Sequence, residues 1–230
     1  MKKIGFIGGT DKTDLITYVA KVLQDLNRRV LVIDATIMQK FRYTLPNINP
    51  TKSYITDFED TDYAIGFENL EEVANYLGVK EFENEKNWNY DYILIDIDNA
   101  SGVTKFGLED SQDSYFVTSF DMYSLKKGID ILKNLPEVMN LSRILINYDT
   151  VQEDEEYLDF LTIDTKVVWK SFSVFLMVTT ENQEIIEENQ RVYKARLKRL
   201  VPEYQETIVY IVQNIVKDIS TSRIRKMIKE

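Results

Sequence analysis

The feature of this sequence that most constrains its fold is a short apolar segment that runs directly into two glycines and then into a helical pattern. Residues 2–7 (KKIGFI) are rich in strand formers, and the letters GGTDKT follow at positions 8–13. Leu15, Val19, Val22, Leu23 and Leu26 then fall at helical spacing. A second run, RVLVID at residues 29–34, is typical of a strand buried on both faces of a parallel sheet. The first 34 residues therefore predict a strand, a tight loop, a helix and a parallel strand.

The alternation of strand and helix patterns continues along the chain. Further strands are predicted at residues 90–97, 114–119, 143–147 and 166–178, and helices at 67–77, around Leu125–Leu135, and at 182–200 and 203–219. Residues 38–62 are polar and contain two prolines, which favours loops with a short helix. This order predicts an α/β fold with a doubly wound, mostly parallel sheet and helices on both faces. We expect one domain over residues 1–230, with a basic amphipathic tail at 222–230.

Composition excludes several kinds of chemistry. The chain has no Cys and no His, which removes disulfides, thiol nucleophiles, Ser-His-Asp catalysis and zinc sites with imidazole or thiolate ligands. The net charge of -10 argues against nucleic acid as a partner, because phosphate binding needs a surplus of Lys and Arg. No apolar run has the length of a signal peptide or a membrane span. We therefore expect a cytoplasmic protein.

The segment between the first strand and the first helix has the order of a phosphate-binding loop. In such a loop, Gly-rich backbone amides surround phosphates at a helix N-terminus, a Lys reaches the terminal phosphates, and a Ser or Thr hydroxyl binds magnesium. Gly8, Gly9, Lys12 and Thr13 are the candidate residues. A purely structural role stays open, in which the glycines form the turn and Lys12 and Thr13 begin the helix.

Together these motifs resemble the MinD/ParA family of P-loop NTPases. GGTDKT is similar to the family's KGGxGKT loop, RVLVIDA to its second strand, YDYILID to its Walker B strand and RILINYD to its late strand. The resemblance implies a P-loop NTPase-like fold, with ATP or ADP and magnesium as candidate cofactors. It assigns Asn147 to the nucleotide base, and Thr13, Asp34 and Asp96 to a candidate magnesium site.

The sequence departs from the family pattern where the chemistry is most demanding. Ile7 stands in place of the signature Lys, Asp11 in place of the last loop glycine, and Thr36 in place of the catalytic Asp. A carboxylate at position 11 adds negative charge to a site for polyphosphate. We therefore expect no catalytic residues, weak or absent ATPase activity and no tightly bound cofactor. The resemblance then implies a scaffold or positioning factor for a membrane-associated assembly of the pilus, secretion or flagellar type. The alternative is a weak ATP-dependent dimerisation switch.

The last residues of the chain form a candidate contact surface. A short basic amphipathic helix can lie on an anionic membrane, and the resemblance implies this use at the inner face of the membrane. A contact with a partner protein and a solvated terminus stay open as alternatives for this tail, and a homodimer stays open for the chain as a whole. The candidate residues are Arg223, Ile224, Arg225, Lys226, Met227 and Ile228.

Two charged runs have simpler interpretations. The acidic residues 152–156 favour a solvated helix start, where carboxylates complement the helix dipole. The basic residues between 191 and 199 could bind DNA, as the resemblance implies for some members, but the net negative charge weighs against it.

Overall fold

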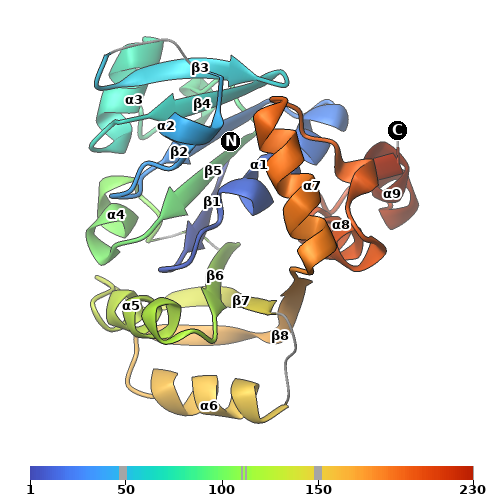
Figure 1. Cartoon of the computed structure of the whole chain (residues 1–230). Helices are drawn as coiled ribbons and strands as arrows, with labels where there is room; N and C mark the ends of the chain where they lie inside the picture. Colours follow the sequence, from blue (N-terminus) through green and yellow to red (C-terminus); the bar gives the residue numbers. More distant parts are fainter. Residues whose placement is uncertain (47–50, 110, 112, 148–151, 230) are drawn as a thin grey trace.

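The computed structural model describes residues 1–46, 51–109, 111, 113–147 and 152–229. Over these residues the strands form one sheet in the order β3-β4-β2-β5-β1-β6-β7-β8 (Figure 1). The strands are β1 Lys2–Ile7, β2 Val30–Asp34, β3 Tyr54–Phe58, β4 Thr61–Ile65, β5 Tyr92–Ile97, β6 Ser114–Ser119, β7 Met139–Asn147 and β8 Val167–Met177.

Neighbouring strands are parallel except for β3, which pairs antiparallel with β4 at the edge. The helices are α1 Thr13–Asp25, α2 Phe41–Thr44, α3 Leu70–Leu77, α4 Ala100–Lys105, α5 Met122–Lys133, α6 Gln152–Thr162, α7 Thr180–Arg191, α8 Pro202–Ile215 and α9 Thr221–Lys229. The predicted doubly wound, mostly parallel α/β fold is confirmed.

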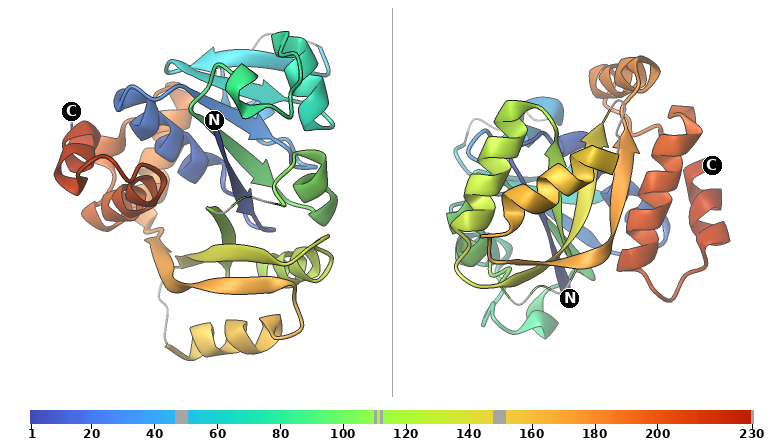
Figure 2. Two further views of the ribbon diagram at one scale, coloured as in Figure 1. Left: turned by 180° about the vertical axis from the view of Figure 1, so that it is seen from behind. Right: turned by 90° about the horizontal axis from the view of Figure 1, so that it is seen from below.

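Helices cover both faces of the sheet, and each face has its own apolar cluster. Side chains from α1, α7, α8 and α9 share one cluster with the sheet, whereas α3, α4, α5 and α6 contribute to the other. Figures 1 and 2 show α7, α8 and α9 together on one side, and α6 at the end of the molecule opposite β3.

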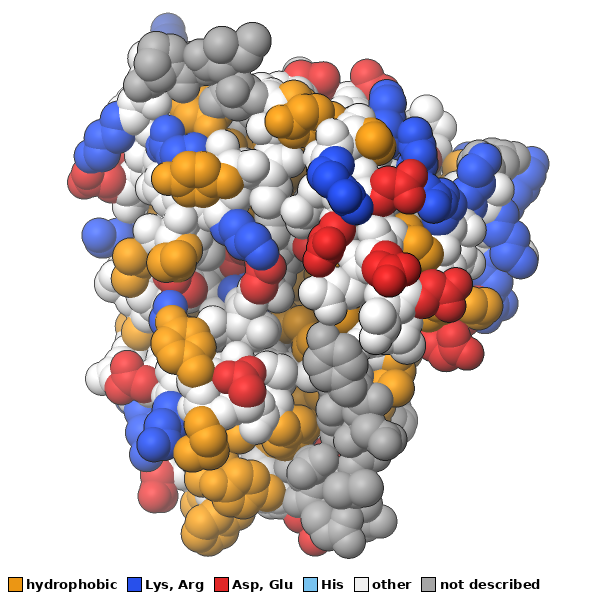
Figure 3. All heavy atoms as spheres, in the orientation of Figure 1, with side chains coloured by type: hydrophobic (Ala, Val, Ile, Leu, Met, Phe, Trp, Pro, Cys, Tyr) orange, Lys and Arg blue, Asp and Glu red, His pale blue; other side chains and the backbone are white. Residues whose placement is uncertain are grey.

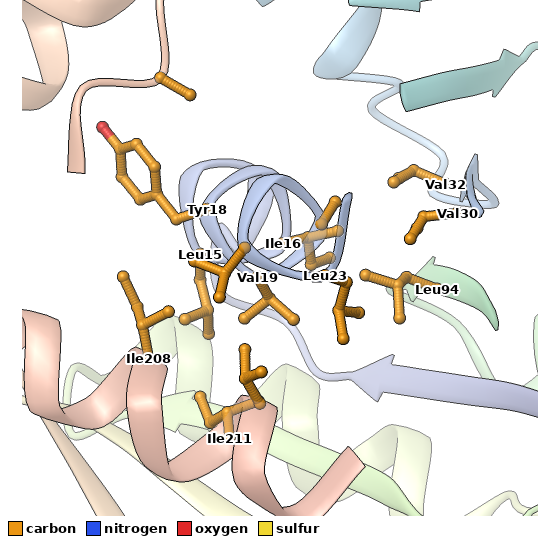
Figure 4. Close-up of a cluster of buried hydrophobic side chains, with 14 of the residues drawn as sticks. Leu15, Ile16, Tyr18, Val19, Leu23, Val30, Val32, Leu94, Ile208 and Ile211 are labelled. Carbon is orange, nitrogen blue, oxygen red and sulfur yellow. The ribbon is translucent and has the colours of Figure 1, made fainter. Parts of the chain in front are cut away.

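Helix α1 lies at the centre of the first cluster, where it contacts both the sheet and α8. Leu15, Val19 and Leu23 have almost no exposed surface, and Ile208 and Ile211 of α8 face them (Figure 4). Each such side chain contributes about 1.5–3 kcal/mol by leaving water. This packing fixes the N-terminus of α1, and with it the loop that precedes the helix.

The prediction of loops with a short helix for residues 38–62 is wrong in its second half. This region contains the short helix α2, but also strand β3 and the first residues of β4. The two strands are joined through Glu59 and Asp60, whose φ angles are 52° and 62°. A two-residue hairpin with two positive φ angles usually carries Asn-Gly or Asp-Gly. With Glu-Asp at these positions, the sequence lacks the usual signal.

The predicted helix over residues 182–200 is also shorter than expected. Helix α7 ends at Arg191, and a separate 3-10 turn spans Leu197–Arg199. The chain leaves the helix at Tyr193, whose φ is 48°. The sequence has no Gly or Pro at this point, which is why its periodicity predicted a longer helix. Helix α4 was not predicted at all.

Candidate functional site

The parallel sheet brings the candidate residues to one edge. The carboxyl ends of β1, β2 and β5 are adjacent, which is where open α/β sheets bind ligands. Asp34 and Asp96 are paired in register on β2 and β5, at the ends of these strands. The loop from Gly8 to Lys12 leaves β1 at the same edge and leads into α1.

Packing alone requires both loop glycines. A Cβ at Gly8 would lie 1.9 Å from the backbone oxygen of Val117 in β6. A Cβ at Gly9 would lie 2.8 Å from the Cβ of Lys127 in α5. Both contacts are shorter than a side chain tolerates, so the glycines allow the loop to approach β6 and α5. Their presence therefore does not depend on a phosphate.

Lys12 is buried and bonded to its own loop. Its side chain donates hydrogen bonds of 2.9 Å to the backbone oxygens of Gly8 and Thr10. Its Nζ also lies 3.0 Å from Oδ1 of Asp96. Burial raises the pKa of Asp96 to about 7, although the positive charge of Lys12 acts in the opposite direction. Lys12 is thus the internal counter-ion of a buried carboxyl group.

Asp11 occupies the groups that a phosphate loop would offer to its ligand. Its Oδ1 accepts hydrogen bonds from the backbone N–H of Thr13 at 3.1 Å and from the Thr13 hydroxyl at 2.8 Å. Its Oδ2 accepts a hydrogen bond from Lys40. Burial acts to raise the pKa of Asp11, but the bonds from Lys40 and Thr13 outweigh it and hold the pKa below its usual value. A carboxylate of the chain therefore sits at the N-terminus of α1, where an anion is favoured.

Asp34 supports the loop that follows β2. Its Oδ1 accepts from the backbone N–H of Thr36 at 3.1 Å and from the Thr36 hydroxyl at 2.6 Å, and its Oδ2 accepts from the N–H of Phe41 at 3.1 Å. Burial raises its pKa against these hydrogen bonds. Thr36 also accepts from the N–H of Gln39 at 2.9 Å. Both side chains therefore hold the backbone of this loop.

Sequence reasoning missed a further ion pair at the same edge. Asp98 accepts from the N–H of Ile37 at 2.9 Å and from Nζ of Lys127 at 3.0 Å. Burial acts to raise the pKa of Asp98, but these bonds lower it overall. A signal for Asp98 existed, since it follows Asp96 at the end of β5. Lys40 and Lys127 carry no comparable signal, because their roles depend on how α2 and α5 are placed.

These groups surround a pocket of about 480 Å³. Its lysines Lys12, Lys40 and Lys127 are each paired with an aspartate, namely Asp96, Asp11 and Asp98. The pocket is therefore close to electrically neutral, whereas a polyphosphate site needs a positive surplus. An apolar rim of exposed side chains lies on the loop after β2, on α2 and at the start of α5. It consists of Met38, Tyr43 and Tyr123, which line the pocket, and of their chain neighbours Ile37 and Met122; all five are 58–78% exposed.

The space-filling view shows this arrangement on the surface. Hydrophobic side chains gather over α2 and the start of α5, on either side of acidic and basic groups (Figure 3). The proposed magnesium ligands Thr13, Asp34 and Asp96 come together at this edge, but the polar atoms of Thr13 and Asp34 are bonded within the chain. Across the described residues, no group of three or more carboxylates is arranged to hold a metal ion. A magnesium ion or a nucleotide phosphate at this place would have to displace these internal bonds.

The remaining predicted contacts lie away from this pocket or outside the described side chains. Asn147 is the last residue of β7, and its side chain is outside the described part of the structure. The side chains of residues 152–154 in the acidic run are likewise outside it. Within the described chain, no helix has the length and apolarity needed to cross a membrane.

The basic tail forms α9 and is packed onto the protein. Ile224 and Ile228 are 0% and 3% exposed, and Met227 is partly buried against the same cluster. Arg225 donates two hydrogen bonds to Glu206 of α8, at 2.8 and 2.7 Å. The two isoleucines that would enter a membrane therefore face the core instead. Arg223, Lys226 and the Arg225 side chain remain at the surface.

The sequence matches no protein-family model and no curated protein. Solved structures do share the fold. The chain is similar to a ParA family ATPase from Chlorobium tepidum, with 15% identity, a TM-score of 0.61 and coverage of 94% of this chain and 98% of the other. It is equally similar to the MinC:MinD cell division complex of Aquifex aeolicus, with 15% identity, a TM-score of 0.61 and coverage of 96% and 98%. An ATP complex of a substituted form of Cyanothece McdA has 10% identity, a TM-score of 0.58 and coverage of 96% and 98%.

Proposed function

We propose that this chain, which has the fold of the ParA and MinD ATPases, is a scaffold that works without hydrolysing ATP. It would position a membrane-associated assembly of the pilus, secretion or flagellar type at the inner face of the membrane, through protein contacts. The solved structures with this fold include an ATPase of the ParA family and a MinC:MinD cell division complex. Their similarity in fold supports the positioning role, and the composition of the pocket supports the loss of hydrolysis.

The single observation that carries this proposal is the placement of Asp11. Its carboxylate already accepts the N–H and hydroxyl of Thr13, and it also binds Lys40. A phosphate in the same position would meet a negative charge that is covalently part of the loop. Two unit charges 4 Å apart repel by about 1 kcal/mol in water and about 4 kcal/mol at an effective dielectric constant of about 20. Since about 1.4 kcal/mol changes affinity tenfold, this repulsion lowers the affinity for one phosphate charge by about fivefold to about a thousandfold.

Protein contact is supported by the apolar rim. Five large apolar side chains around the pocket are more than half exposed, and such a cluster marks an interaction site more often than a solvated surface. A second copy of the chain is one occupant of this surface, and a different protein is another. The basic side of α9 could add attraction to an anionic membrane, but its isoleucines are packed in the core.

The test is calorimetric titration with ATP and with ADP in the presence of magnesium. We expect no binding by the native protein up to millimolar nucleotide, and measurable binding by the variant Asp11→Gly. Asp11→Asn should give an intermediate result, because it removes the charge but keeps the side chain. Asp164→Asn is the matched control, since it removes one negative charge from an exposed residue beyond α6.

The outcomes separate the two candidate functions. Micromolar binding by the native protein would support the alternative, an ATP-dependent dimerisation switch, and turnover would then be measured. If Asp11→Gly binds no better than the native chain, Asp11 is not the obstacle, and the argument from its placement is wrong. If Asp11→Asn and Asp164→Asn increase nucleotide affinity equally, the increase comes from the change in net charge and not from the position of Asp11.

A further inference from the structure

We infer that the outer face of α6 is a docking surface for a cationic amphipathic helix of another protein. Helix α6 connects β7 to β8 in the chain and lies at the end of the molecule opposite β3 (Figures 1 and 2). This surface is separate from the pocket at the phosphate loop, and the inference does not rest on the proposed function.

The inner face of α6 is firmly attached to the fold. Leu158 is fully buried, and Thr162 is 5% exposed. Nε1 of Trp169 in β8 donates to the Thr162 hydroxyl at 3.2 Å. Arg143 of β7 forms an ion pair with Asp159, and the Ser173 hydroxyl of β8 donates to Glu155 at 3.0 Å. The orientation of the helix is therefore set, and so is the face that it presents to solvent.

The second half of the outer face is apolar. Tyr157, Phe160 and Ile163 recur every three residues, which places them on one side of the helix and of the turn that continues it. They are 47%, 68% and 71% exposed. Figure 3 shows hydrophobic side chains gathered at this end of the molecule. Aromatic side chains at a fixed position on a rigid element are the usual anchors of a protein interface.

The charge around Tyr157, Phe160 and Ile163 determines which kind of partner can bind there. Helix α6 has the sequence QEDEEYLDFLT, with no Lys or Arg, and Asp164 follows it. Two of its five carboxylates, Glu155 and Asp159, are bonded on the inner face, while Glu156 and Asp164 are exposed beside the apolar side chains. A second copy docking through the same face would bring two sets of carboxylates together, which is unfavourable. An anionic membrane or a nucleic acid would be repelled for the same reason. A helix with an apolar stripe flanked by Lys or Arg complements both features.

The protein's own basic helix does not fit this role. Helix α9 is amphipathic and cationic, but Ile224 and Ile228 are buried against the core. A neighbouring copy therefore cannot offer the apolar side of α9 without partial unfolding. The helix that binds here must therefore belong to a different protein.

The test uses two labelled synthetic helices of equal length, one built from Leu and Lys at helical spacing and one from Leu and Glu. Fluorescence anisotropy with the full-length protein should show saturable binding of the Leu/Lys helix, weakened by salt, and no binding of the Leu/Glu helix. The double variant Phe160→Ser with Ile163→Ser should weaken binding by about tenfold or more, because two apolar anchors contribute over about 1.4 kcal/mol. Glu156→Lys with Asp164→Lys should weaken it by a similar factor.

The matched control is Met122→Ser with Tyr123→Ser, which removes two exposed apolar side chains from the rim of the pocket and should leave binding unchanged. Circular dichroism and thermal unfolding establish that each variant is folded. The inference is overturned if the Leu/Lys helix binds the Phe160→Ser, Ile163→Ser variant as well as the native protein, or if the Leu/Glu helix binds equally. It is also overturned if the same variant abolishes self-association or sedimentation with anionic vesicles, since either result assigns the face to another occupant.

Discussion

Asp14, in the first turn of α1, is partly buried beside α7. Its Oδ1 accepts a hydrogen bond from Gln190 at 2.9 Å, but burial dominates and raises its pKa from 3.8 to about 6. Unfolding exposes the carboxyl group and returns its pKa to the ordinary value. The folded state therefore holds the proton more tightly, and stability from this group falls as the pH rises from about 4 to 6.

We expect Asp14→Asn to stabilise the protein at pH 7 by about 1–2 kcal/mol, because the amide carries no charge to bury and still accepts from Gln190. At pH 3.5, where the carboxyl group is protonated in the folded state and mostly protonated in the unfolded state, most of the gain should disappear. Urea unfolding at the two pH values measures the difference. An equal change at both would show that the charge of Asp14 is not the cause.

Lys12 provides a second prediction at this scale. Removing one partner of a buried ion pair costs about 3–5 kcal/mol, and Lys12 is the neighbour of the buried Asp96. Lys12→Met should therefore lower the free energy of unfolding by about 3 kcal/mol at pH 8. The loss should be smaller at pH 6, because the Asp96 carboxyl, with a pKa of about 7, can then be protonated.

The double variant Lys12→Met with Asp96→Asn is the control and should recover part of the loss. If Lys12 served only to bind phosphate, Lys12→Met would not lower the free energy of unfolding. Urea unfolding of the single and double variants distinguishes these cases.

The residues of the site were predictable where the backbone sets their position. Gly8, Gly9, Lys12 and Thr13 follow from a strand, a tight loop and a helix, and Asp96 follows from the end of a buried strand. Their partners were not predictable. The pairing of Asp11 with Lys40 depends on how α2 folds over the loop, which no local pattern encodes.

At the scale of elements, strong periodicity predicted most of the sheet and the major helices. The hairpin of β3 and β4 was missed because Glu59 and Asp60 make a turn that usually carries Gly or Asn. The end of α7 was missed for a similar reason. Tyr193 adopts the left-handed conformation there, with its N–H bonded to Gln190 and that of Lys194 bonded to Asn189, which is a Schellman arrangement.

Tyr193→Gly should stabilise the protein by about 0.5–1 kcal/mol, because glycine adopts this conformation without steric cost. The Tyr193 side chain is 48% exposed, so the packing of its buried half offsets part of this gain. Thermal unfolding measures the gain. The control Tyr210→Gly, at an exposed position inside α8, should be destabilising by at least a similar amount. A loss of stability in Tyr193→Gly would mean that the tyrosine ring packs more than its exposure indicates.

Helix α9 gives the second prediction at this scale. Ile224 and Ile228 join the core cluster of α1 and α8, and each buried side chain contributes about 1.5–3 kcal/mol. Truncation before Thr221 should therefore lower the free energy of unfolding by about 3 kcal/mol or more. Arg223→Glu is the matched control, because Arg223 is exposed, and should change stability little. A truncated protein as stable as the native one would mean that α9 detaches readily, which would restore its isoleucines as candidates for membrane contact.

At the scale of the whole molecule, net charge and the apolar rim have opposite effects on self-association. Two copies that each carry a charge of -10 repel at long range, while Ile37, Met38, Tyr43, Met122 and Tyr123 surround a pocket whose ion pairs are internal. If copies pair through this rim, no nucleotide is needed to neutralise the interface. Added salt should then strengthen the dimer by screening the repulsion, whereas it would weaken a complex held by opposite charges.

Sedimentation velocity at low and at high salt, each with and without MgATP, tests this expectation. We expect a dimer whose population rises with salt and is unchanged by MgATP. Met122→Ser with Tyr123→Ser should weaken it by about tenfold, since two apolar anchors leave the interface, whereas Phe160→Ser with Ile163→Ser on α6 should not. A dimer that forms only with MgATP would instead favour the ATP-dependent switch. A monomer under all conditions would show that a second copy does not bind the rim, and a different protein would then be the remaining candidate partner.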